Sequence, residues 1–215
     1  MKTACLLAGL FLIVHSLTGQ IRAVTEKGDT LLIYRDGTWE YLDEDQQLMP
    51  TEVSYSLDTI RQLFTVLPSS AKALRSELDF FNIKYNPEVW ERVPEGTINE
   101  DAEFAFKAKL GDVYGLVISE EAGFDAEGLF QIAMENMKES VDELKVLSAD
   151  VRKVNGKDCI SAVVKTKTKG LPLIFHSYYF SGEKGSIQFT TWTVENLYAK
   201  YQNMILELLN GLVID

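Results

Sequence analysis

The C-terminal stretch from Asn155 to Asp215 constrains the fold of this chain more than any other. Three strand-like runs follow one another there, Asp158–Lys167, Leu171–Ser181 and Ser186–Val194, joined by short connections that contain glycine. Such connections favour antiparallel hairpins. The last segment repeats apolar residues at helical spacing, at Leu197, Tyr201, Ile205, Leu208, Leu209 and Leu212. This stripe needs an apolar surface to cover it, so we expect an antiparallel sheet with a helix packed across it.

The middle of the chain supplies further strands and a second helix. Phe81–Tyr85, Glu103–Lys109, Val113–Ser119 and Leu144–Val154 are strand-like, and the last of these leads into an Asn155-Gly156 turn. A helix is predicted from an Asp125 cap to about Leu144. Its expected buried face consists of Leu129, Ile132, Ala133, Met137, Val141 and Leu144. Runs of strands separated by helices indicate an α+β fold with a mostly antiparallel sheet.

Residues 1–19 have the pattern of a signal peptide. Lys2 precedes an apolar run from Ala4 to Val14, and small and polar residues follow it. The run is shorter than the roughly 20 apolar residues of a membrane-spanning helix. We therefore expect cleavage between Gly19 and Gln20 and an exported product, periplasmic or secreted, without a stable membrane span.

Residues 20–45 are expected to form a small β-meander. Ile21–Thr25, Thr30–Arg35 and Thr38–Leu42 are strand-like, and Asp36-Gly37 between the last two is a strong hairpin signal. The sequence from Ala23 to Tyr41 resembles an N-terminal "DGTW" module common in exported proteins of Bacteroidetes-type bacteria. The position of Gln20, directly after the expected signal peptide, also resembles exported proteins of that group. The resemblance implies no activity.

Residues 46–76 are interpreted as a linker with one short helix over Leu57–Leu67, and residues 77–215 as the main α+β domain. This domain has an aromatic-rich first strand, a following Trp90, an Asn155-Gly156 turn before long hairpins, and a closing helix. In these features it resembles the PsbP-like α/β/α fold. That fold is shared by photosystem lumenal subunits, a nuclear Ran-binding regulator and several bacterial envelope proteins. The resemblance implies a non-catalytic interaction domain and transfers no functional residue.

The net charge argues against several classes of partner, and the cysteine content argues against an intramolecular disulfide. The chain has 21 basic and 32 acidic residues, and loss of Lys2 with the signal changes the net charge from −11 to −12. Nucleic acid and anionic lipid surfaces need a positive footprint, so we expect neither as a partner. Only Cys159 remains after signal cleavage, which leaves no intramolecular disulfide. We expect Cys159 to be a buried small hydrophobe.

The sequence contains no recognisable catalytic, cofactor or metal motif. His176 is the only histidine outside the signal, and its strand context favours a partly buried, hydrogen-bonded role. Glycine-rich phosphate loops and the G-x-S-x-G elbow are missing. The acidic groups at 99–103 and 120–127 lack calcium-loop spacing. We therefore predict a protein that is not an enzyme and has no catalytic, cofactor-binding or metal-binding residues.

Aromatic residues are the remaining candidates for function. We predict that Trp39, Tyr41, Tyr179 and Trp192 contribute to an interaction surface for a protein partner. One alternative is a carrier that holds a small apolar ligand between sheet and helix, in a cavity lined by residues such as Phe130, Phe175 and Trp192. Another is a hydrolase, which requires two converging carboxylates.

Overall fold

The structure is a computed structural model of the whole chain. It describes residues 21–24, 30–33, 39–41, 55–94, 96–121 and 125–215. The chain divides into two compact units, Met1–Val53 and Ser54–Asp215. None of the described helices is long and apolar enough to cross a membrane.

The N-terminal unit contains the predicted meander. Strands β1 (Ile21–Val24), β2 (Thr30–Ile33) and β3 (Trp39–Tyr41) pair antiparallel in the order β1-β2-β3. The register places Ile33 opposite Trp39 and Leu31 opposite Tyr41. The predicted Asp36-Gly37 turn lies outside the described residues.

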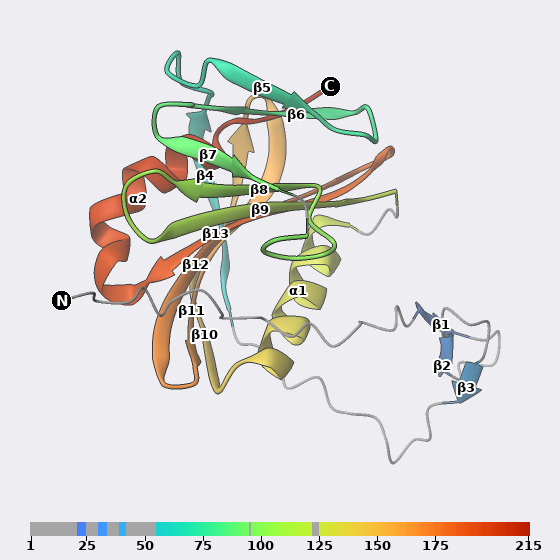
Figure 1. Cartoon of the computed structure of the whole chain (residues 1–215). Coiled ribbons are helices and arrows are strands. Elements are labelled where there is room, and N and C mark those ends of the chain that lie inside the picture. Colours follow the sequence, from blue (N-terminus) through green and yellow to red (C-terminus); the bar gives the residue numbers. More distant parts are fainter. Residues whose placement is uncertain (1–20, 25–29, 34–38, 42–54, 95, 122–124) are drawn as a thin grey trace. The chain divides into compact units, whose positions relative to one another are not determined.

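The larger unit is built on an eight-stranded sheet with the order β4-β10-β11-β12-β13-β9-β8-β7 (Figure 1). The bounds are Leu57–Phe64 for β4, Trp90–Val93 for β7, Phe104–Ala108 for β8, Val113–Glu120 for β9, Glu143–Val154 for β10, Lys157–Thr168 for β11, Leu171–Gly182 for β12 and Gly185–Val194 for β13. Only β4 and β10 pair in parallel, so the predicted α+β fold with a mostly antiparallel sheet is confirmed.

Tight turns fix the register of the long C-terminal hairpins. Asn155 and Gly156 have φ of 48° and 88°, and Lys169 and Gly170 have φ of 50° and 81°. Two successive residues with positive φ characterise the type I′ turn, whose twist matches that of the flanking strands. The prediction of hairpins at these two positions is confirmed.

Two helices cover opposite faces of the sheet. Helix α1 (Ala126–Ser140) is capped by Asp125, whose Oδ1 accepts from the amide of Gly128 at 2.6 Å. Helix α2 is Glu195–Leu209. Phe130 of α1 packs on Tyr179, whereas α2 contacts His176 on the same strand. Residues three apart in a strand point to opposite faces, so the sheet lies between α1 and α2.

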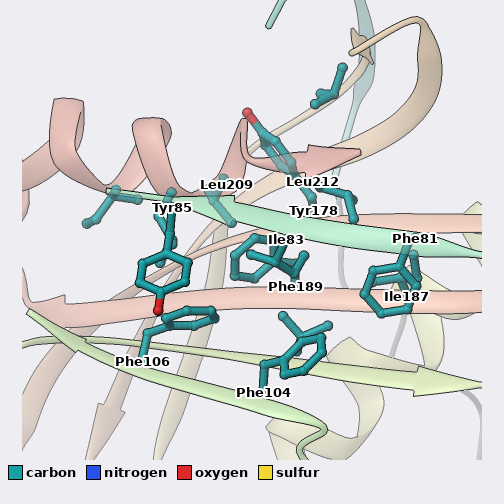
Figure 2. Close-up of a cluster of buried hydrophobic side chains, with 14 of the residues drawn as sticks. Phe81, Ile83, Tyr85, Phe104, Phe106, Tyr178, Ile187, Phe189, Leu209 and Leu212 are labelled. Atoms are coloured by element: carbon teal, nitrogen blue, oxygen red, sulfur yellow. The ribbon is translucent and has the colours of Figure 1, made fainter. Parts of the chain in front are cut away.

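A second sheet completes the core on the α2 side. It has the order β14-β6-β5, with β5 at Lys72–Arg75, β6 at Phe81–Tyr85 and β14 at Leu212–Ile214. Figure 2 shows buried side chains of this sheet meeting those of the main sheet and of α2. The rings of Tyr85 and Phe106 are 5.2 Å apart, edge to face.

The predicted helix over Leu57–Leu67 is wrong, because this segment contains strand β4. Leu57, Ile60 and Phe64 are its partly buried apolar residues, and their spacing of three and four resembles that of a helix. The ladder with β10 slips where Ile60 pairs with Arg152 and Leu63 pairs with Lys153. This irregularity disturbs the two-residue alternation of a regular strand.

Both predicted helices end earlier than expected. Helix α1 ends at Ser140 and buries Leu129, Phe130, Ala133 and Met134, while Ile132 is exposed. Leu144 belongs to β10, whose pairing with β11 begins at Glu143. Leu212 is not on α2 but in β14, which pairs with β6. Gly211 separates the two elements, and a Cβ there would collide with the carbonyl oxygen of Lys84.

Candidate functional site

The only histidine in the described part of the chain connects the sheet to α2. His176 is buried on β12, with 3% exposure. Its Nε2 lies 3.2 Å from the hydroxyl of Ser161 on β11, and its Nδ1 lies 3.0 Å from the hydroxyl of Tyr198 on α2. A neutral imidazole donates from one nitrogen and accepts at the other, so both contacts can be satisfied at once.

Burial determines the protonation of this site. Desolvation lowers the pKa of His176 to about 3, and the positive charge of Arg152 acts in the same direction. Burial also raises the pKa of the Cys159 thiol to about 12, with 3% of the residue exposed. Near neutral pH the imidazole is therefore uncharged and the thiol protonated. These environments agree with the structural roles expected for both residues.

A buried ion pair lies next to this histidine. Arg152 donates from Nε and Nη2 to the two carboxylate oxygens of Asp150, at 2.5 and 2.6 Å. Its guanidinium carbon is 4.5 Å from the centre of the Phe64 ring. The hydroxyl of Tyr178 donates to Oδ1 of Asn210 at 2.8 Å, at the end of α2. The two-bond geometry compensates both buried charges.

The contact between Ser161 and His176 has the spacing of a nucleophile and its base, but the surroundings do not suit catalysis. Only 1% of Ser161 is exposed, and the imidazole is oriented by Tyr198 rather than by a carboxylate. A substrate could not reach the hydroxyl without displacing α2. This pair therefore joins β11, β12 and α2. Sequence reasoning did not identify Ser161 or Tyr198, because only strand register and helix packing bring them to His176.

Carboxylates gather at an open pocket of about 240 Å³. It is lined by Glu77, Leu78, Glu100, Asp101, Ala102, Glu103 and Ser119. Glu103 accepts from the hydroxyls of Ser76 and Ser119 and from the amide of Glu77, the last at 2.6 Å. One of these donors reaches Oε1, and the two hydroxyls reach Oε2. Within the described ranges, no group of three or more acidic, histidine or cysteine residues is arranged to hold a metal ion.

A row of aromatic side chains crosses the α1 face of the sheet. Tyr114 on β9 stacks on Trp192 of β13 with ring centres 5.6 Å apart, and Trp192 stacks on Phe175 of β12 at 6.0 Å. Phe175 is buried, while Tyr114 and Trp192 are half-buried. Helix α1 packs mainly against β11 and β12. The outer end of the aromatic row, at Tyr114 and Trp192, is therefore only partly covered.

The residues predicted to form an interaction surface differ in their exposure. Trp192 is half-buried in the aromatic row and accessible at the surface. Tyr179 has no exposed area, because Phe130 of α1 packs on it with ring centres 5.2 Å apart, so its place in a surface patch was predicted wrongly. Trp39 and Tyr41 lie in β3, but their side chains are outside the described part of the chain.

No protein-family model and no curated protein matches this chain. Among solved structures, it is similar to the cyanobacterial PsbP (CyanoP) of Synechocystis sp. PCC 6803, with a TM-score of 0.52 and 12% identity over 70% of this chain and 95% of that one. The chain has a PsbP-like fold. At this identity the likeness concerns the fold alone, and it confirms the fold expected from the sequence.

Two further structures align less well. One is from Bacteroides thetaiotaomicron VPI-5482, with a TM-score of 0.46 and 17% identity over 68% of this chain and 49% of that one. The chain thus spans about half the length of that structure. The other is LpqN of Mycobacterium tuberculosis, described as involved in cell envelope biogenesis, with a TM-score of 0.44 and 7% identity over 66% of this chain and 89% of that one.

Proposed function

We propose that this protein is an exported, non-catalytic accessory protein that binds a protein partner through Tyr114 and Trp192. Export rests on residues 1–19, which have the pattern of a signal peptide cleaved before Gln20. An origin in Bacteroidetes-type bacteria and a "DGTW" module at residues 23–41 are part of the same proposal.

The partly covered end of the aromatic row is the observation that carries the proposal. Tyr and Trp are enriched among the residues that dominate binding energy at protein interfaces. Tyr114 and Trp192 present large apolar surfaces whose positions are fixed by stacking and by paired strands, since Tyr114 and Trp192 are direct cross-strand partners. A rigid aromatic pair loses little conformational entropy when a partner covers it.

The packing under α1 gives little support to the carrier alternative. Phe130 and Phe175 were expected to line a cavity, but Phe130 has no exposed area and packs between Tyr55 and Tyr179. Phe175 packs on Trp192. These side chains fill the space that a ligand would need. The hydrolase alternative is also weakened, because Glu103 at the acidic pocket is already engaged by three hydrogen-bond donors.

Site-specific photo-crosslinking in the protein's own cell envelope tests the proposal. The photoreactive residue p-benzoylphenylalanine replaces Tyr114 in the full chain, and a control carries it at Lys200, an exposed position on α2. We expect a discrete protein adduct from position 114 and none from position 200. The mass of the chain recovered without a crosslinked partner reports whether it begins at Gln20.

Two substitutions locate the binding surface. Trp192→Ala should abolish the adduct from position 114, whereas Trp192→Phe, which keeps a stacked ring, should retain it. Trp39→Ala tests whether the N-terminal meander binds the partner. Loss of the adduct in this variant would assign the binding surface to the meander. If Trp192→Ala remains folded by circular dichroism and still yields the adduct, the proposed surface is wrong.

A further inference from the structure

The two halves of α2 are held to the sheet by different kinds of contact. In the C-terminal half, Ile205, Leu208 and Leu209 have no exposed area. Asn210 then accepts from the hydroxyl of Tyr178, and its carbonyl accepts from the side chain of Asn155 at 2.8 Å. Apolar burial of this extent is insensitive to moderate changes of pH, so the C-terminal half of α2 is fixed to the core.

The N-terminal segment of α2, Glu195–Lys200, lacks such anchors. None of its residues is fully buried, and its N-cap, Val194, makes no side-chain capping hydrogen bond. Absence of a capping side chain weakens a helix end by about 1 kcal/mol. The ring of Tyr201 packs at the β8–β9 turn, where Gly111 leaves room for it. This residue therefore marks the boundary between the two halves.

Two polar contacts tie this segment to the sheet. Nζ of Lys165 on β11 lies 2.6 Å from Oε1 of Glu195, with both side chains about 40% exposed. The hydroxyl of Tyr198 contacts Nδ1 of His176 at 3.0 Å. The second contact includes a group that acid changes, because protonation of His176 places a charge in a buried site.

The surroundings of His176 oppose its protonation. The charged and titratable groups around it are Asp150 and Arg152 on β10, Cys159 and Lys165 on β11, Tyr178 on β12, and Glu195 and Tyr198 on α2. Asp150 has both oxygens engaged by Arg152, and Glu195 is paired with Lys165, so each of these carboxylates already has a cationic partner. Movement of Tyr198 away from the sheet would instead let water solvate the charge.

We propose that Glu195–Lys200 is an acid-labile flap, which opens from the sheet at acidic pH while Ile205–Leu209 stays packed. Opening exposes His176 and Ser161 to solvent. The flap is thus a conformational device on the α2 face of the sheet, and it is independent of the aromatic row proposed to bind a partner.

Hydrogen exchange of the full chain tests this directly. The reporters are the amides of Ala199 to Met204, because each donates to a carbonyl of the flap four residues earlier. After correction for intrinsic rates, we expect their protection to fall about tenfold between about pH 7 and pH 4. The amides of Ile205 to Leu209 should keep their protection. Simultaneous loss in both sets would indicate global unfolding and overturn the proposal.

Matched substitutions separate the two contacts. Glu195→Gln removes an ion pair between two partly exposed side chains, so it should lower the protection of the flap amides severalfold already at neutral pH. His176→Gln keeps hydrogen-bonding capacity without a titrating ring. The double variant Glu195→Gln/His176→Gln should therefore show flap protection that no longer depends on pH. The control is Glu207→Gln, on the C-terminal half, where the carboxylate accepts from Ser69. Val194→Asp supplies a cap and should raise protection. If Glu195→Gln and Val194→Asp, both near the surface, leave flap protection unchanged, the proposal fails.

Discussion

Asn155 offers the sharpest test of how this fold is held together. Its side chain joins three parts of the unit: Oδ1 accepts from the amide of Val66 at 2.9 Å, and Nδ2 donates to the carbonyls of Asn210 and Leu212 at 2.8 and 2.7 Å. It thereby links the residues after β4 to the end of α2 and to β14. The backbone of Asn155 also has a φ of 48°, which asparagine adopts more readily than most residues.

The cost of Asn155→Ala follows from these two features. Three lost hydrogen bonds of about 0.5–1.5 kcal/mol each contribute about 1.5–4.5 kcal/mol. The left-handed backbone adds about 1 kcal/mol for alanine. We therefore expect the free energy of unfolding to fall by about 2.5–5.5 kcal/mol. Asn155→Gly loses the same hydrogen bonds without the backbone strain, so its loss should be about 1 kcal/mol smaller.

Urea unfolding of the full chain, followed by circular dichroism, measures both variants. Lys169 provides the matched control, because it has the same left-handed backbone, with a φ of 50°, in an exposed turn. Lys169→Gly should therefore stabilise the protein by about 1 kcal/mol. A loss of less than about 1 kcal/mol for Asn155→Ala would refute the role assigned to its side chain.

Three further predictions concern single sites. Asp150→Asn should lower the free energy of unfolding by about 3 kcal/mol in urea, because Arg152 stays buried without its counter-charge, and the double variant Asp150→Leu/Arg152→Met should recover most of this loss. Gly211→Ala should cost about 3 kcal/mol in the same assay, since its Cβ collides with the backbone of Lys84. The pKa of His176 is about 3 when folded and 6.5 when unfolded, so stability is lost as pH falls between these values. His176→Gln should therefore reduce the slope of the unfolding free energy against pH in this range by up to about 1.4 kcal/mol per pH unit. An unchanged slope would contradict the lowered pKa of His176.

Local sequence signals predicted most of the strands, because they depend on neighbouring residues. The Asn155-Gly156 and Lys169-Gly170 turns and the alternation of the long C-terminal strands needed no tertiary information. The failures arose where distant partners decide the structure. Leu57–Phe64 becomes a strand because β10 offers an edge to pair with, and Leu212 leaves the helical pattern because β6 does the same.

The polar cluster beneath α2 could not be predicted for a related reason. His176, Ser161 and Tyr198 come from three elements, and nothing local in the sequence indicates that they meet. The aromatic row could be predicted in part, since Trp192 was among the residues expected to form an interaction surface. Tyr179 was assigned wrongly because the choice between the two faces of β12 depends on where α1 packs.

The two proposals can be tested independently because they concern opposite faces of the sheet. Trp192 faces α1, whereas its neighbour Thr191 faces α2 and donates its hydroxyl to the carbonyl of His176 at 2.8 Å. The backbone of β13 between these side chains is paired on both edges, with β12 and with β9. Opening of the flap therefore breaks contacts of α2 without breaking the ladders that position Tyr114 and Trp192. Crosslinking from position 114 should persist in Glu195→Gln, and its loss there would show that the two faces are coupled.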